Sequence, residues 1–146
     1  MNELLRSLVR AATGVSWLYF ASQKWGGIEW MRPLIEQSAA RNPLPGLHQL
    51  LAIVVVPNWR LAALGQAVGE TLAGALLAVG LATRPAAWLG VLLGLGLSAT
   101  VAFTLTDAGL RWLYYLAVLL NLAVAVGGPG GIALGRVRGV PAWARR

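Results

Sequence analysis

Glu70 is the side chain with the clearest capacity for chemistry, because it places a carboxylate near the middle of a long apolar stretch. An ionised residue at the centre of a membrane helix costs roughly 2.5 kcal/mol or more unless it is paired, protonated or hydrated. Gln66 lies four residues earlier, one turn along the same helix face, where the two side chains can interact. We therefore expect Glu70 to be partnered and able to exchange a proton.

Other polar residues within apolar stretches are candidate partners for Glu70. With the first two spans side by side and their centres level, an extended Arg10 nearly reaches Glu70. Asn121 lies about as deep as Arg10, and Tyr114 is two turns earlier on the same helix face. The sequence thus predicts one interior polar cluster with Glu70 and Arg10 as catalytic candidates. The binding candidates are Gln66, Tyr114 and Asn121. Two interpretations stay open: a salt bridge that fixes helix register, and a headgroup, proton or ion site.

The elements that must position these residues follow from the composition. Of the 146 residues, 58% are hydrophobic and 12% are charged, whereas soluble domains have roughly 45–50% apolar and 25% charged residues. Apolar stretches of about 20 residues predict four membrane spans, at residues 4–23, 61–82, 86–105 and 110–126. The predicted fold class is an all-α, integral membrane four-helix bundle, residues 1–146 as one domain, with a long outer loop between helices 1 and 2.

Outside the spans, the sequence predicts an outer loop at 24–60 and a basic cytoplasmic tail at 127–146. The apolar run at 47–56 covers only about 15 Å as a helix, half of the hydrocarbon core, so an interfacial or re-entrant segment is expected there. Lysine and arginine residues are more numerous on the side of the membrane where the termini lie than on the other side. This excess predicts cytoplasmic termini. Every tryptophan except Trp17 falls near a predicted membrane interface. We expect Trp17 to lie inside the bundle or to face the lipid. We expect a multi-pass protein of the plasma (inner) membrane in contact with lipid.

Composition also excludes several kinds of site. The sequence has no cysteine, which rules out disulfides, Cys-ligated clusters and thiol chemistry. Its single histidine, His48, cannot supply the paired ligands of a haem or zinc site, so no haem, metal or thiol centre is expected. The net charge of +7 comes from arginines that flank apolar segments, and this pattern indicates membrane topology, with no nucleic-acid partner.

Small residues mark the expected contacts between helices, because burial of apolar surface does not drive association within lipid. Two ridges at four-residue spacing stand out, Gly65, Gly69 and Ala73 in the second span and Gly90, Gly94 and Ser98 in the third. They predict packing within one bundle or, as the alternative, a homodimer through the glycine ridges.

Several motifs, in their order and spacing, resemble a known family. The first-span signature of the DoxX and DoxD membrane proteins is similar to Arg10, Gly14, Trp17, Leu18 and Lys24. Their second-span signature is similar to Glu70, Gly74, Gly80, Leu81, Thr83 and Arg84. The segment 121–135 resembles the ending of the DoxD type, and the chain departs from that type in continuing with a basic tail. The resemblance covers residues 6–135.

The resemblance implies a four-helix membrane protein that is, in some members, the small subunit of a thiosulfate:quinone oxidoreductase and, in others, a membrane partner of redox enzymes. We therefore predict a membrane subunit of a quinone-linked oxidoreductase acting on thiosulfate or another small sulfur compound. Quinone is the expected cofactor, and a redox partner protein or second subunit is the expected source of electrons. Whether this chain is itself an enzyme stays open.

In the hypothesised mechanism, Glu70 exchanges protons and Arg10 holds its charge, while Gln66, Tyr114 or Asn121 bind the ring carbonyls. Cationic side chains on the outer face are expected to attract an anionic reductant, namely Lys24, Arg32, Arg41 and Arg60. Two alternatives remain: a small proton-coupled membrane transporter that uses Glu70, and a structural membrane anchor for a redox partner.

Overall fold

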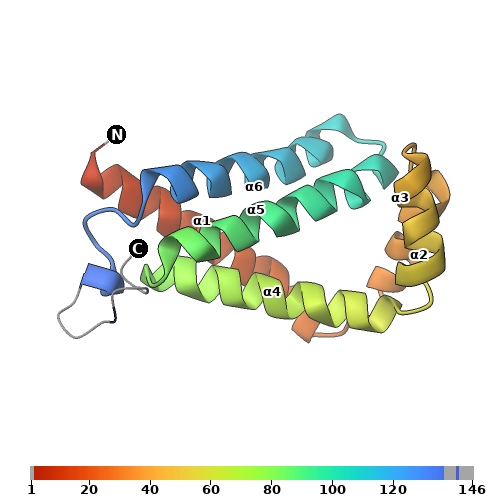
Figure 1. Ribbon diagram of the computed structural model, residues 1–146, viewed down its shortest axis with the longest axis horizontal. Helices are drawn as coiled ribbons and strands as arrows, with labels where there is room; N and C mark the ends of the chain where they lie inside the picture. Colours follow the sequence, from red (N-terminus) through yellow and green to blue (C-terminus); the bar gives the residue numbers. More distant parts are fainter. Residues whose placement is uncertain (1, 137–140, 142–146) are drawn as a thin grey trace.

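The computed structural model describes residues 2–136 and 141, and all regular structure in this part of the chain is helical, which confirms the all-α class. Four long helices lie side by side, α1 (Glu3–Trp25), α4 (Trp59–Val79), α5 (Thr83–Ala99) and α6 (Ala108–Gly127) (Figure 1). The shorter helices α2 (Met31–Arg41) and α3 (Pro45–Leu50) lie across one end of them (Figure 1). A π-helical segment, η1 (Leu51–Val55), continues α3, and two 3₁₀ turns, η2 (Val101–Thr104) and η3 (Leu134–Arg136), follow α5 and α6.

Three helical stretches of the described chain are long and apolar enough to cross a membrane, namely Trp59–Val79, Thr83–Thr104 and Ala108–Gly127. Large apolar side chains are exposed along them, including Leu61, Val68, Leu92, Leu113 and Val126. Soluble monomers rarely expose such extensive apolar surface, so this surface suits lipid. The fourth long helix, α1, has 23 residues and packs against α4 and α6, but charged residues interrupt its apolar run.

Local signals set the ends of the long helices. The side chains of Asn2 and Asp107 accept hydrogen bonds from the first backbone N–H groups of α1 and α6, as N-cap residues do. Gly80 ends α4 with a φ of 74°, a left-handed conformation that glycine adopts without a steric penalty. A tight turn then leads directly into α5, so that α4 and α5 form a helical hairpin.

The segment 24–60 is mostly helical. α2 packs against η1 and η2, and the Asn42 side-chain amide donates a hydrogen bond of 2.7 Å to the carbonyl of Ala99 at the end of α5. Nδ1 of His48 contacts the carbonyl oxygen of Ala39, which joins α3 to α2. These contacts hold the crosswise helices against the ends of α4 and α5, and they engage His48 in packing.

A close helix crossing joins α1 and α4 at Gly14 and Gly74, outside the two ridges predicted from sequence. A Cβ atom at Gly14 would lie 2.4 Å from the backbone nitrogen of Ala78 and 2.8 Å from the carbonyl oxygen of Gly74. In the third-span ridge, a Cβ at Gly94 would lie 2.9 Å from Val118 of α6, so this ridge packs within the chain. Gly65 has open space beside it.

The chain after α6 returns to the first turns of α1. The backbone N–H of Gly131 donates to the carbonyl of Glu3 at 3.2 Å, and that of Ile132 donates to the hydroxyl of Ser7 at 3.0 Å. Part of the predicted basic tail, residues 137–140 and 142–146 with Arg138, Arg145 and Arg146, lies outside the described residues.

Candidate functional site

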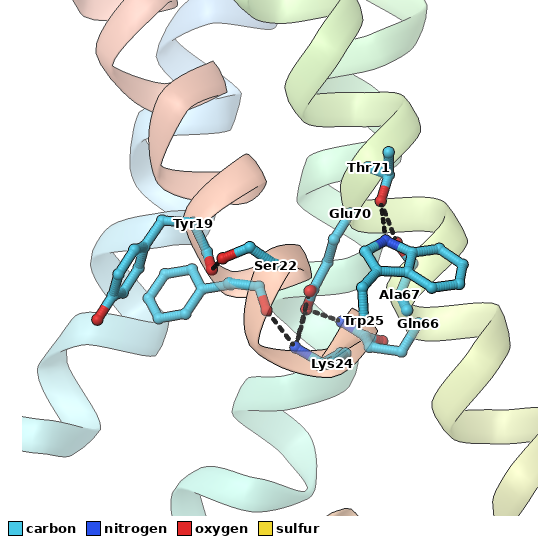
Figure 2. Close-up of polar contacts among 9 residues, drawn as sticks. Tyr19, Ser22, Lys24, Trp25, Gln66, Ala67, Glu70 and Thr71 are labelled. Atoms are coloured by element: carbon cyan, nitrogen blue, oxygen red, sulfur yellow. Dashed lines mark hydrogen bonds and ion pairs between the residues drawn. The ribbon is translucent and has the colours of Figure 1, made fainter. Parts of the chain in front are cut away.

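Glu70 lies near the middle of α4, where its side chain is fully buried (0% exposed) and ion-paired with Lys24 of α1. The Lys24 ammonium donates to both carboxylate oxygens, at 2.9 Å to Oε1 and 2.7 Å to Oε2 (Figure 2). Gln66 donates to Oε1 at 2.8 Å from one turn earlier on α4 (Figure 2). The carboxylate is thus partnered, as its place in an apolar helix requires, by a charged and a neutral donor.

Lys24 reaches this position from the last turn of α1. Its Nζ also donates to the carbonyl of Phe20 at 3.3 Å and lies 5.9 Å from the ring centre of Trp30. The next residue, Trp25, donates from its indole nitrogen to the hydroxyl of Thr71 at 2.9 Å, beside the ion pair (Figure 2). The end of α1 is therefore fixed to the middle of α4 by two neighbouring polar contacts.

The expected pairing of Arg10 with Glu70 is wrong. The Arg10 side chain is buried, but its guanidinium donates to backbone carbonyl oxygens at the other end of α4 and in the segment after α6. These are the carbonyls of Leu77, Ala78, Pro129 and Ile132. The last carbonyls of a helix lack intrahelical partners and carry partial negative charge, so a cation is favoured there.

Helix register explains this difference. The sequence-based argument set the centres of the first two spans level, whereas Gly14 at the middle of α1 contacts Gly74, five residues beyond Gly69 at the middle of α4. At about 1.5 Å per residue, α1 is displaced by roughly 7 Å toward the end of α4. This displacement takes Arg10 away from Glu70 and brings Lys24 closer, so that the Lys24 and Glu70 side chains meet at 2.7 Å.

The single polar cluster predicted from sequence is divided in the structure. Asn121 is fully buried and accepts a hydrogen bond of 3.2 Å from the indole nitrogen of Trp17, while its amide donates to the carbonyl of Ala117. Tyr114 is half-buried on α6. Within residues 2–136, no hydrogen bond links either Asn121 or Tyr114 to Glu70. Of the predicted binding residues, only Gln66 contacts the carboxylate directly.

Sequence reasoning missed Lys24 as the partner of Glu70 and placed it on the outer face as an attractor of anions. In the structure Lys24 is 7% exposed and its charge is engaged by the carboxylate. A usable signal was present, because Lys24 is the only lysine in the sequence and closes the first apolar stretch. A lysine near a helix end can extend its long stem along the helix, and here it does so toward the interior.

A cavity lies beside Gln66, the neutral partner of the Glu70 carboxylate. Gln66, which donates to Glu70, also lies on the wall of a cavity of about 200 Å³ at the end of the molecule covered by α2 and η1. A molecule in this cavity would lie one side chain away from a carboxylate that is otherwise withdrawn from solvent. Among the described residues, no group of three or more His, Asp or Glu is placed to hold a metal ion.

Comparison with family models, with curated proteins and with solved structures finds no match to this chain. The resemblance to DoxX and DoxD proteins therefore stays a prediction from motifs, and the geometry described above is what supports a function.

Proposed function

We propose that the chain is a four-span protein of the plasma membrane, with α1 as the fourth crossing helix and both termini in the cytoplasm. The length of α1, its packing against α4 and α6, and its exposed apolar residues, such as Leu8 and Val15, support this arrangement. The charges of α1 that would oppose insertion are both engaged, Arg10 by carbonyls and Lys24 by Glu70.

We propose that this protein acts as the membrane subunit of a quinone-linked oxidoreductase resembling the DoxX/DoxD type. The observation that carries the proposal is the fully buried Glu70 carboxylate, paired with Lys24 and connected through Gln66 to a cavity. A quinone, when bound, takes up two electrons and two protons. Electrons come from a small sulfur compound such as thiosulfate, directly or through a partner protein.

The residues of this chain have separate tasks in the proposal. Glu70 takes up a proton and passes it on, and the Lys24 ammonium stabilises the carboxylate when the proton has left. Gln66 lies on the cavity wall and orients Oε1 of the carboxylate through its hydrogen bond. This assigns to Lys24 the role that the sequence analysis gave to Arg10.

A second candidate function is a structural membrane anchor for a redox partner. The observation that favours it is the complete engagement of the ion pair, which joins α1 to α4 and needs no ligand. The two candidates differ in what they require of Glu70, because an anchor uses the ion pair only for packing, whereas the oxidoreductase also uses it for proton exchange.

Glu70→Gln tests the proposal. Membranes of source cells that lack the chain are complemented with wild type or with the variant, and thiosulfate-dependent quinone reduction is followed by absorbance. A neutral amide cannot take up the proton, so we expect the rate to fall by at least about a hundredfold, the usual contribution of an acid–base group. The matched control is Glu36→Gln, which removes an exposed carboxylate paired with Arg32 and should leave the rate unchanged.

A wild-type rate in Glu70→Gln, accompanied only by a lower unfolding temperature, would identify the protein as an anchor. Proton-linked substrate flux into sealed vesicles, lost in Glu70→Gln, would instead identify a transporter.

A further inference from the structure

The half-open cavity beside Gln66 is formed by elements from both halves of the chain. α2 and η1 form one side, while α4 and the end of α5 form the other, beyond the point where α1 ends against α4. Its walls are largely apolar, being lined by Met31, Ile35, Leu51, Val55, Leu97 and Val101. Ligand pockets for drug-sized molecules have roughly 300–1,000 Å³. At about 200 Å³ this cavity suits a single ring rather than a larger molecule.

The walls are held by specific contacts. The hydrogen bond from Asn42 to Ala99 fastens the end of α2 to α5. On the neighbouring wall, the backbone N–H of Val56 donates to the carbonyl of Leu51 at 2.8 Å, five residues earlier, which widens the helix into a π-helical turn. Turns of this kind are rare and occur frequently at functional sites.

Ser38 is the observation that points to a ligand. Its side chain is 2% exposed, it lines this cavity from α2, and its hydroxyl oxygen has no hydrogen-bond partner. A buried hydroxyl without a partner costs roughly 1–3 kcal/mol, so an acyl chain in the cavity would leave this cost in place. A ligand with an acceptor atom removes it.

Gln66 offers a second donor from the opposite side. Its amide nitrogen carries two hydrogens, and one of them is used by the Glu70 carboxylate. No charged side chain is among the described residues that line the cavity, which argues against a phosphate or carboxylate ligand. Two neutral donors on apolar walls match a flat, uncharged ring that bears carbonyl oxygens.

We infer that this cavity is the headgroup site for a lipid-soluble carbonyl compound of the quinone class, with Ser38 and Gln66 donating to its ring oxygens. The inference rests on the proposed function and deepens it, because it places the ligand at α2 and η1 instead of near Asn121 and Tyr114, where the sequence analysis expected it. It also puts the ring within one side chain of Glu70.

The test is photolabelling of the full chain in lipid nanodiscs with a short-tailed ubiquinone that carries a photoreactive group, followed by mapping of the labelled peptides. We expect saturable labelling in α2, η1 or the end of α5. Ser38→Ala should raise the half-saturating concentration roughly twofold to tenfold, the equivalent of one hydrogen bond. Gly96→Leu should abolish labelling, because Gly96 lines the cavity and has open space for a side chain.

Matched controls separate binding from folding. Ser98→Ala removes another hydroxyl without a partner, and Gly65→Leu adds the same side chain at another open glycine, and neither residue lines the cavity. Both should label like wild type.

Saturable labelling near Asn121, or wild-type labelling in both Ser38→Ala and Gly96→Leu, would overturn the inference and leave the proposed function standing. An absence of saturable labelling in wild type would overturn the inference together with quinone binding by this chain.

Discussion

A lysine and a glutamate that are withdrawn from water together are stable only as a pair. Burying either charge alone costs several kcal/mol, whereas the two charges at 2.7 Å offset much of that cost. Glu70 receives three hydrogen bonds, two from Lys24 and one from Gln66, so its ionised form is well accommodated. These donors therefore fix the position of the carboxylate at the contact between α1 and α4.

Loss of one partner should cost more than loss of both. We expect Lys24→Met to lower the free energy of unfolding by about 3–5 kcal/mol, because it leaves a buried carboxylate without its counter-charge. The double variant Lys24→Met/Glu70→Leu should recover most of this loss. The measurement is reversible denaturation in bicelles for the two single variants and the double variant. Additive losses would show that the two side chains are not coupled.

At the scale of the elements, the contact between α1 and α4 decides which residues meet. The backbones approach closely at Gly14 and Gly74, because neither residue has a side chain. This contact sets the register that aligns Lys24 with Glu70 and Arg10 with the last carbonyls of α4. Gly14 and Gly74 thus influence the site indirectly, because they set the position of α1 along α4.

Gly14→Ala should separate the two helices. The added Cβ would lie 2.4 Å from a backbone nitrogen that cannot rotate away, so we expect a loss of about 1–3 kcal/mol of stability. Gly65→Ala is the control, because it adds the same methyl group in open space and should stabilise α4 by about 0.5–1 kcal/mol. Thermal unfolding in nanodiscs compares them. Equal stability of the two variants would contradict the assigned crossing.

For the whole molecule, the described chain has two unlike ends. At one end, Arg10 binds carbonyls of α4 and of the segment after α6. It thus joins α1, α4 and this segment and closes that end of the molecule. At the other end, α2 lies across the helices (Figure 1). Residues of α2 and η1 line one side of the cavity there. In the proposed topology, the closed end faces the cytoplasm and the cavity faces the outer half of the membrane.

Single cysteines can test this topology, because the natural sequence has none. Asn2, Gly46 and Pro141 are all exposed. A membrane-impermeant maleimide should label Gly46→Cys from the outside of right-side-out vesicles, and should label Asn2→Cys and Pro141→Cys only in inverted ones. Labelling of Asn2→Cys and Gly46→Cys from the same side would mean that α1 does not cross the membrane.

Most of the secondary structure could be predicted from the sequence, because helix formation depends on local information. Apolar stretches and their polar ends located α1, α4 and α6 to within three residues, whereas α5 ends at Ala99, six residues before the predicted end at 105. The need of Glu70 for partners, and its contact with Gln66, also followed from position within one helix.

Which residues meet between helices was decided only by the tertiary structure. Whether Glu70 meets Arg10 or Lys24 is decided by a shift of about five residues between α1 and α4, and nothing in either helix alone sets that shift. The cavity likewise arises only when residues from α2, η1, α4 and α5 come together, so Ser38 carried no signal in the sequence. The sequence by itself determined the helices and the buried carboxylate, since both follow from hydropathy along one segment. The tertiary structure decided the partner of that carboxylate and the cavity beside it, since both depend on how separate segments are aligned in space.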